Sequence, residues 1–174
     1  MDGMRRGGAA SVMTLKSTGM DRYAYMREAI RMATANVGEG GGPFGAVIVK
    51  DGKVIGRGVN RVTAECDPTA HAEVSAIRDA AKNEGSFDLS GAEIYTSCEP
   101  CPMCLGAIYW AHISKIFYGN TKSDAAKINF DDSFIYKQMS LPEDERAIPQ
   151  ERILGEEAIE TFKAWDAKED KKEY

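Results

Sequence analysis

No run of apolar residues in this chain approaches the roughly 18 that a membrane-spanning helix needs, so the sequence offers no candidate for one. It also has no internal repeat and no low-complexity tract. Of its 174 residues, 43% are hydrophobic and 28% are charged, which excludes the fibrous and the pervasively disordered classes. A chain of this length forms one domain, or one domain with an arm.

Basic residues are in deficit, because 22 Lys and Arg face 27 Asp and Glu and the net charge is −5. This balance argues against a protein built mainly to hold phosphate backbones, so we expect neither nucleic acid nor a membrane as a partner. The first twenty residues lack the apolar stretch of a secretory signal and are rich in Gly, Ser, Thr and Met. We therefore expect residues 1–20 to be a flexible extension and the protein to be cytoplasmic.

Cysteine and histidine are scarce, with four and two residues respectively. Three of the cysteines, Cys98, Cys101 and Cys104, fall within seven residues. In a chain without a secretory signal such clustering more often indicates metal binding or catalysis than a disulfide framework. We interpret Cys66 as an ordinary small residue near a turn, and His112 as a solvated residue at a helix end.

Patterns typical of strands and helices alternate along the chain. An Asp51-Gly52 pair between two β-branched runs predicts a hairpin with strands over residues 44–50 and 53–59. Asp67 and Pro68 are typical of the N-cap and first residue of a helix, here one that runs to about residue 83. The other predicted elements are helices over 21–36 and 102–111 and strands over 94–96 and 113–118. This order predicts an α/β sandwich with helices covering a mixed sheet.

We expect a core over residues 21–141 and a C-terminal arm over residues 142–174. The start of the arm is charged and punctuated by proline, which is typical of a connector. Its remainder is apolar enough to need a docking partner, through Ile153, Leu154, Ile159, Phe162 and Trp165. Packing on a second copy of the chain would satisfy that need and give a homodimer.

Two short segments carry residue types that bind zinc: His71-Ala72-Glu73 and Cys101-Pro102-Met103-Cys104. Together they match the H-x-E and P-C-x-x-C signature of the zinc nucleobase deaminases. Cys101 and Cys104 lie three residues apart at a predicted helix start, where both sulfurs face one side and the helix dipole favours thiolates. With His71 they make three ligands and leave a fourth position for water, as in a catalytic zinc site.

Glu73 lies two residues from His71, where it can move protons between water and a substrate, a role worth about 10²–10⁴ in rate. Alternatively, Cys98 is a fourth ligand and the zinc is structural, or the chain is a non-catalytic zinc module that binds a purine or a protein. Neither alternative has a use for Glu73. We expect Glu99 to make backbone hydrogen bonds near the site.

Longer stretches around these motifs extend the pattern, at residues 41–47, 67–73, 96–104, 130–136 and 171–174. Together they resemble the bacterial guanine deaminases of the cytidine/deoxycytidylate deaminase superfamily. The resemblance implies a cytidine-deaminase-like three-layer α/β/α sandwich around a mixed five-stranded sheet, with one Zn²⁺ per chain. It also implies a domain-swapped homodimer in which Tyr174 of one arm closes the other subunit's pocket.

The same resemblance implies roles for individual residues. The zinc ligands are His71, Cys101 and Cys104, and the catalytic residues are Glu73, as proton shuttle, and Asp132, near the exocyclic amine. The substrate-binding residues are Phe44, Asn60, Ala72, Trp110 and Tyr174. The implied reaction is the hydrolytic deamination of guanine at C2 to xanthine and ammonia, a step of purine catabolism.

Other substrates stay open at this point. A related amino-heterocycle, such as guanosine, cytosine or a triazine, suits the same zinc chemistry. A tRNA adenosine deaminase shares the zinc signature, but its substrate asks for a basic surface that this acidic chain does not offer.

Overall fold

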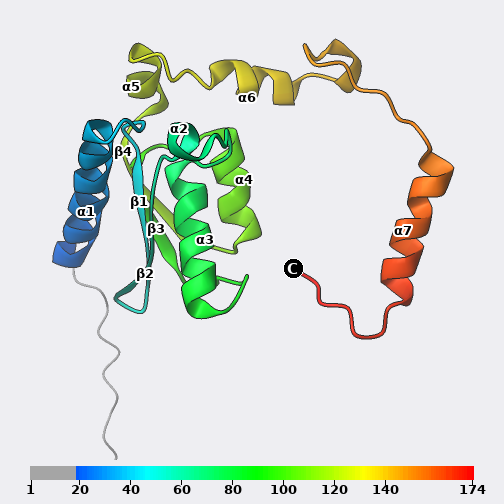
Figure 1. Cartoon of the computed structure of the whole chain (residues 1–174), viewed down its shortest axis with the longest axis horizontal. Coiled ribbons are helices and arrows are strands. Elements are labelled where there is room, and N and C mark those ends of the chain that lie inside the picture. Colours follow the sequence, from blue (N-terminus) through cyan, green and yellow to red (C-terminus); the bar gives the residue numbers. More distant parts are fainter. Residues whose placement is uncertain (1–18) are drawn as a thin grey trace, which may run out of the picture.

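The computed structural model describes residues 19–174, and the side chains from Arg22 onward. The predicted extension over residues 1–20 therefore lies almost entirely outside the described residues. The core has three layers (Figure 1): helix α1 (Gly19–Gly38) covers one face of a sheet, and helices α3 (Ala72–Glu84) and α4 (Pro102–Trp110) cover the other. The predicted α/β/α sandwich is confirmed.

The sheet of the described chain has four strands: β1 (Gly45–Lys50), β2 (Lys53–Val59), β3 (Glu93–Cys98) and β4 (Lys115–Asn120). Their order is β2-β1-β3-β4; β1 is antiparallel to both of its neighbours, whereas β3 and β4 are parallel. The sheet is mixed, as predicted, but the prediction of five strands is wrong. After β4 the chain enters helices α5 (Lys122–Lys127) and α6 (Ser133–Ser140), so it supplies no strand to the outer edge of β4.

The hairpin forms where the sequence predicts it. Asp51 and Gly52 have φ values of 51° and 75°, and two successive residues with positive φ are the requirement of the tight turn that suits the twist of paired strands.

Helix α3 begins later than predicted. Asp67 Oδ1 accepts hydrogen bonds from the backbone N–H of Thr69 (2.8 Å) and from its hydroxyl (2.7 Å), which closes a local turn after the short helix α2 (Val62–Glu65). Because Asp67 caps this turn, it does not cap the helix. His71 is the residue at the N-cap of α3, with extended backbone angles, so its side chain stands at the very end of the helix.

Glycines in β2 let α3 lie unusually close to the sheet. A Cβ atom on Gly56 would come within 2.6 Å of Ala76 O, and one on Gly58 would overlap the backbone of Ala72 and Ala76. The small residues of α3 complete this contact, since Ala72, Ala76 and Ala80 are fully buried. The backbone of β2 thus fixes the position of the first turn of α3.

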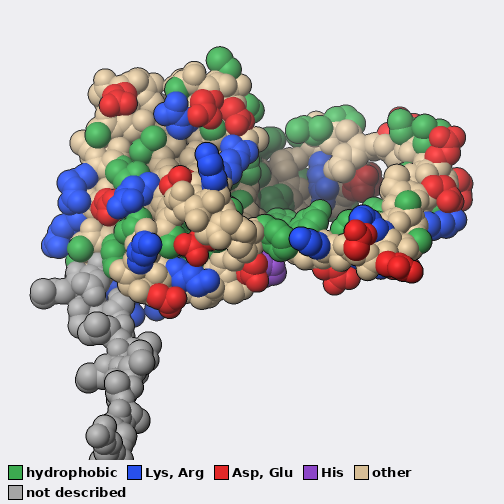
Figure 2. Space-filling model, turned by 60° about the horizontal axis from the view of Figure 1, so that its bottom comes forward, with side chains coloured by type: hydrophobic (Ala, Val, Ile, Leu, Met, Phe, Trp, Pro, Cys, Tyr) green, Lys and Arg blue, Asp and Glu red, His purple; other side chains and the backbone are tan. Residues whose placement is uncertain are grey.

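Beyond α6 the chain runs away from the core (Figure 1) through the 3₁₀ turn η1 (Glu143–Glu145) to helix α7 (Gly155–Ala167). Neither α6 nor α7 makes more than weak contacts with another helix or strand of the described chain. Figure 2 shows hydrophobic side chains exposed along this part. Those predicted to need a partner are all exposed: Ile153, Leu154, Ile159, Phe162 and Trp165. Among residues 19–174, no helix combines the length and apolarity that crossing a membrane requires.

We predict that Gly58→Ala destabilises the fold, because the new methyl group must push α3 away from β2. Overpacking of this kind costs about 1–3 kcal/mol. The matched control is Gly106→Ala in α4, where a Cβ meets no atom within 4 Å and alanine is favoured over glycine by about 1 kcal/mol. Urea unfolding of both variants measures the difference, and a Gly58→Ala protein as stable as the parent would contradict the close contact.

Candidate active site

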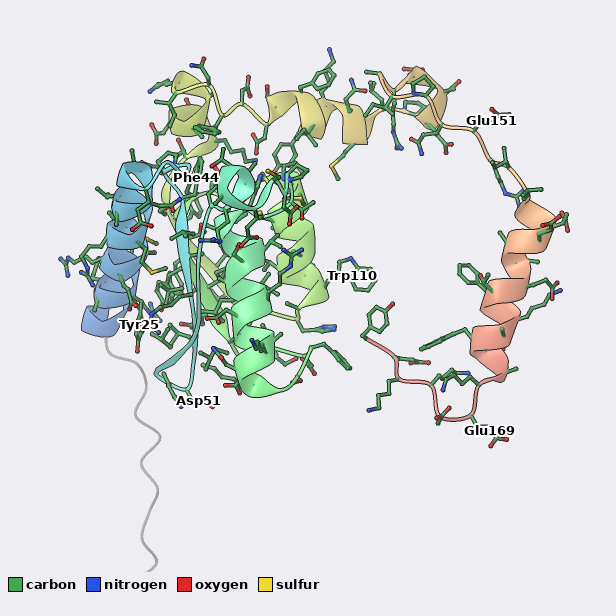
Figure 3. All side chains as sticks on the ribbon, in the orientation of Figure 1. Tyr25, Phe44, Asp51, Trp110, Glu151 and Glu169 are labelled. Atoms are coloured by element: carbon green, nitrogen blue, oxygen red, sulfur yellow. The ribbon has the colours of Figure 1, made fainter. Side chains whose placement is uncertain are left out.

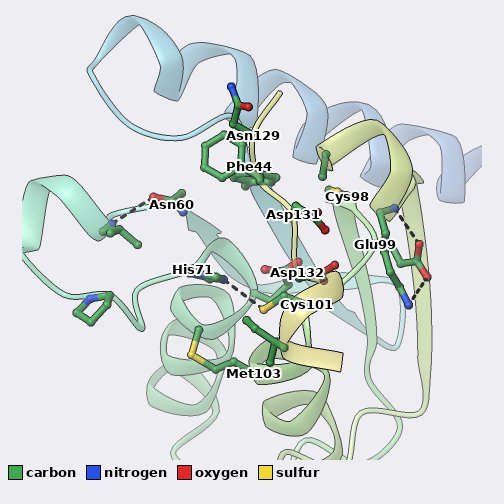
Figure 4. Close-up of a pocket in the computed structure, with 17 residues that line it drawn as sticks. Phe44, Asn60, His71, Cys98, Glu99, Cys101, Met103, Asn129, Asp131 and Asp132 are labelled. Carbon is green, nitrogen blue, oxygen red and sulfur yellow. Dashed lines mark hydrogen bonds and ion pairs between the residues drawn. The ribbon is translucent and has the colours of Figure 1, made fainter. Parts of the chain in front are cut away.

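Two helix starts meet at the carboxyl end of β3. His71 is the N-cap of α3, and Cys101 is the N-cap of α4, with Cys104 in its first turn. The His71 Nδ1 atom lies 3.5 Å from the sulfur of Cys101 and 3.5 Å from that of Cys104. The three donor atoms all lie within 4.8 Å of one another. The structure thus brings together the three residues that the sequence predicts as metal ligands. Figure 4 shows two of them, His71 and Cys101, facing each other.

The spacing of these donors fits a zinc ion. Zn–S bonds of about 2.3 Å and Zn–N bonds of about 2.0–2.1 Å at tetrahedral angles place nitrogen and sulfur donors roughly 3.6 Å apart. The observed 3.5 Å between His71 Nδ1 and each sulfur agrees with that value. One imidazole and two thiols are also donors that zinc prefers. In the described chain Cys98 does not join this donor group, so the structure does not favour a closed structural site.

The helix start favours the ionised form of Cys101. The backbone N–H of Cys104 points at its sulfur across 3.5 Å, as an N-cap acceptor requires. Hydrogen bonding from Cys104, supported by His71, lowers the pKa of Cys101 to about 4. Contact with Cys101 in turn raises the pKa of His71. A thiolate is the form of cysteine that ligates metals, so Cys101 is prepared for that role.

Glu73 is buried beside the donors, in the first turn of α3, with 5% of its surface exposed. Burial raises the pKa of its carboxyl group, and a hydrogen bond from Thr96 opposes that shift. Thr96 Oγ1 lies 2.8 Å from Glu73 Oε1 and 3.0 Å from the carbonyl oxygen of Cys98. The hydroxyl can donate to an ionised Glu73, or accept from a protonated one while donating to Cys98 O. Thr96 can therefore form a hydrogen bond with Glu73 whether the carboxyl group is ionised or protonated.

A cavity of about 510 Å³ opens over these groups, a size usual for small-molecule sites. Its lining comes from four parts of the chain: Phe44, Asn60, Val62 and Pro68; His71 and Glu73; Cys98, Glu99, Cys101 and Met103; and Lys122, Ala125, Asn129, Phe130, Asp131, Asp132 and Ile135. Figure 4 shows Phe44 and Asn60 on the side of the cavity away from Met103. Most of the exposed surface of the cavity is apolar, and charged and amide side chains, among them Glu73, Asp132 and Asn60, also reach it.

Asn60 is fixed by its neighbours. Its Oδ1 accepts a hydrogen bond from the backbone N–H of Val62 (3.2 Å), which leaves the Nδ2 group as the donor end of the amide. Asn36 holds the surrounding loops, because its Nδ2 donates to the carbonyl oxygens of Asn60 and Gly42, both at 2.8 Å. Asn60 is 8% exposed and so presents a nearly rigid polar group to the cavity.

Asp132 reaches the cavity from the other side, at the residue before α6. Partial burial raises the pKa of its carboxyl group, and the nearby Cys101 adds to the shift. Phe130 in the same segment packs edge-on against Phe44, with ring centroids 5.0 Å apart.

The predicted backbone hydrogen bond of Glu99 is present, since its Oε2 accepts from the N–H of Lys122 (3.1 Å).

Three residues of the predicted substrate-binding set do not line the cavity. Ala72 is fully buried between His71 and Glu73. Trp110 stands at the C-terminal end of α4, the opposite end from Cys101, and Figure 3 shows it projecting from that helix toward the C-terminal tail. Tyr174 meets Trp110 there, with ring centroids 6.1 Å apart. Both are largely exposed, and neither is among the residues that line the cavity of the described chain.

The sequence also left some site residues unidentified, chiefly Thr96, Phe130 and Lys122. A signal existed for Thr96, because strand side chains alternate and Thr96 shares the face of Ile94, which packs under α3. A polar residue on that buried face is unusual and calls for a partner. Phe130 begins the stretch 130–136 that contributes to the resemblance, although the resemblance implies no role for it. Lys122 carries no comparable signal, since its position depends on the path of the chain after β4.

A three-layer sandwich that holds one histidine and two cysteines beside a buried glutamate defines the class of zinc-dependent deaminases. Residues 20–120 match the family described as the cytidine and deoxycytidylate deaminase zinc-binding region, and the chain belongs to this family.

Several known proteins are similar to this chain. Guanine deaminase of Bacillus subtilis (strain 168) is 51% identical over 156 residues, which cover 89% of this chain and all of the relative. A crystal structure of guanine deaminase from B. subtilis, 52% identical, superposes with a TM-score of 0.85 over 87% of this chain and 98% of that one. A structure of guanine deaminase from Nitrosomonas europaea is 33% identical, with a TM-score of 0.61 over 63% and 64% of the two chains. The tRNA-specific adenosine deaminase of B. subtilis is 41% identical over 55% of this chain and 59% of its own length.

We predict that Cys104→Ser loses zinc, because it replaces a soft buried donor of the cluster. The loss of affinity should exceed the roughly 10- to 100-fold that changes around a ligand cost. Cys66→Ser is the matched control, since Cys66 is exposed and outside the donor cluster. Elemental analysis after dialysis measures zinc per chain; full occupancy in the Cys104→Ser protein would contradict the ligand set.

Proposed function

We propose that this protein catalyses the zinc-dependent hydrolytic deamination of guanine to xanthine and ammonia, as a cytoplasmic enzyme of purine catabolism. The observation that carries the proposal is the extent of the similarity. The alignment with guanine deaminase of B. subtilis covers 156 residues, whereas the zinc-binding region spans only residues 20–120. The alignment therefore also includes most of the chain after residue 120. That part supplies Phe130, Asp132 and Ile135 to the cavity.

Deamination of adenosine in tRNA is supported less well. The tRNA-specific relative of B. subtilis aligns over only 95 residues, a length that fits within the region common to the family. On the face of the described core that Figure 2 shows, Lys and Arg side chains are interspersed with Asp and Glu and form no continuous basic surface. The net charge of −5 points the same way.

In the proposed mechanism His71, Cys101 and Cys104 hold the zinc ion. Zinc, when bound, supplies Lewis-acid chemistry that lowers the pKa of water to about 7 and so provides a nucleophile at neutral pH. The chain's own residues must then hold the base, move protons and keep bulk water out.

Glu73 moves the protons. Thr96 Oγ1 binds Oε1 of Glu73 at 2.8 Å, which holds the carboxyl group beside the metal ligands, where it takes a proton from the attacking water. Its raised pKa lets the buried carboxyl keep that proton until it passes to the ring and then to the departing amine. The water oxygen forms a bond to C2, the C2–N bond to the exocyclic amine breaks, and ammonia leaves with the transferred proton.

The cavity walls position the base. The Phe44 ring offers an apolar face for the planar purine, and the Nδ2 group of Asn60 donates a hydrogen bond to it. Asp132 faces the exocyclic amine and assists its departure. A buried amide and carboxyl discriminate between bases, because a wrong base leaves them without partners.

We also propose that the enzyme works as a homodimer whose arms, residues 142–174, exchange between subunits. The exposed apolar residues of the arm support this, since α7 packs closely on no other helix or strand among residues 19–174. Trp110 and Tyr174 support it as well: they meet each other at the end of α4 away from their own cavity. The resemblance implies that Trp110 and Tyr174 contact the substrate base. Since they lie away from their own cavity, the base that they contact is bound in the cavity of a second subunit.

We predict that the wild-type protein releases ammonia from guanine in preference to guanosine, adenine, cytosine and a triazine. Glu73→Gln should keep zinc and fold and lose at least the roughly 10²–10⁴ that acid–base catalysis supplies, because the amide cannot take a proton. A coupled ammonia assay over the five substrates gives the comparison. Preference for another substrate would replace guanine in the proposal, and near wild-type turnover by Glu73→Gln would refute the mechanism.

We predict that Tyr174 acts in the partner's pocket. Chains lacking Glu173 and Tyr174, and Glu73→Gln chains, should each be inactive alone while keeping zinc. Co-expressed, they should regain about a quarter of wild-type activity, since random pairing gives half of the dimers one competent pocket. No recovery in verified mixed dimers would show that the tail serves its own subunit.

A further inference from the structure

The segment that carries Asp132 needs an anchor. Asp132 lies between α5 and α6, and neither helix makes more than weak contacts with the other helices or strands of the described chain. At one end, Phe130 packs on Phe44. At the other end, Tyr136 of α6 contacts Lys122 and Pro100, and the proposed mechanism uses neither Tyr136 nor Lys122.

Lys122 is the centre of these polar contacts. Its Nζ lies 3.6 Å from Oε1 of Glu99 and 4.0 Å from the centre of the Tyr136 ring, while its backbone N–H donates to Glu99 Oε2 (3.1 Å). The Tyr136 hydroxyl donates to the carbonyl oxygen of Pro100 (3.4 Å). Lys122, Glu99, Tyr136 and Pro100 thus form a closed ring of contacts, which we term the clamp.

The clamp joins Asp132 to the metal site. On the metal side, Glu99 and Pro100 directly precede the ligand Cys101. On the other side, Tyr136 is one helical turn after Asp132, and its backbone N–H donates to Asp132 O (3.2 Å). Fixing the Tyr136 ring therefore fixes the start of α6, where Asp132 is located.

We propose that Lys122 is a positioning residue that holds the Asp132 carboxylate over the cavity by clamping α6 to the metal-binding loop. It does not act on the substrate itself. A half-exposed ion pair of this kind adds little to the stability of the fold, so its effect is on placement. A cation against an aromatic ring fixes the direction of α6, and a misplacement of about 1 Å can cost roughly 100-fold in rate. The inference rests on the proposed function only through the role of Asp132.

The test replaces Lys122 with Met, which keeps the apolar stem and removes the charge. Lys127→Met is the matched control, a lysine of the same helix that lies outside the clamp and the cavity. Lys122→Arg is the conservative rescue, because arginine retains the charge and the stacking on Tyr136. Zinc content is measured in every variant and should not change.

We expect Lys122→Met to lower kcat for guanine by roughly 10- to 100-fold with little change in KM, and Lys122→Arg to recover most of the loss. In an Asp132→Asn background, Lys122→Met should cause no further loss. Equal loss in both backgrounds would overturn the proposal, because Lys122 would then act other than through Asp132. A kcat for Lys122→Met no lower than that of Lys127→Met would also overturn it.

Hydrogen exchange separates this proposal from the proposed function. Amides of residues 129–136 should exchange faster in Lys122→Met than in the wild type or in Lys127→Met, whatever the substrate. Faster exchange in a protein that does not deaminate guanine would support the clamp and refute the function. Unchanged exchange in an active Lys122→Met enzyme would refute the clamp alone.

Discussion

The function of this chain depends on two helices that begin side by side at the carboxyl end of β3. Each helix start carries a partial positive charge: at α4 it favours the Cys101 thiolate, and at α3 it lies beside Glu73, whose pKa burial nevertheless raises. The start of α3 is held there by backbone contact with β2, where Gly56 and Gly58 remove the side chains that would keep the helix away. The position of His71, at the start of α3, therefore depends on main-chain packing.

Features set by local spacing were predictable from the sequence. The Asp51-Gly52 turn, the covering helices and the His71, Cys101 and Cys104 donors each follow from residues close together in the chain. The start of α3 was misplaced because the Asp67 side chain bonds to Thr69, a local alternative that competes with helix capping. The fifth strand came from resemblance alone, and no run of residues after β4 forms it.

Residues whose position depends on the path of the chain were harder to assign to the cavity from the sequence. Resemblance placed Phe44, Asn60 and Asp132 at the cavity, and the structure brings all three there. It placed Trp110 and Tyr174 in the same list, although they lie together at the far end of α4. No pattern along a single chain distinguishes a residue that faces its own pocket from one that faces another subunit's.

The site divides into two parts of different origin. Metal donors and the proton carrier come from helix starts fixed by the sheet, whereas much of the cavity wall comes from loops and from the segment after β4. A relative named for guanine aligns with this chain over 156 residues, whereas one named for adenosine in tRNA aligns over 95, no longer than the zinc-binding region. With this division, the cavity wall can change in sequence while the metal donors and the proton carrier stay the same. New substrates become accessible through altered loops while the hydrolytic apparatus stays as it is.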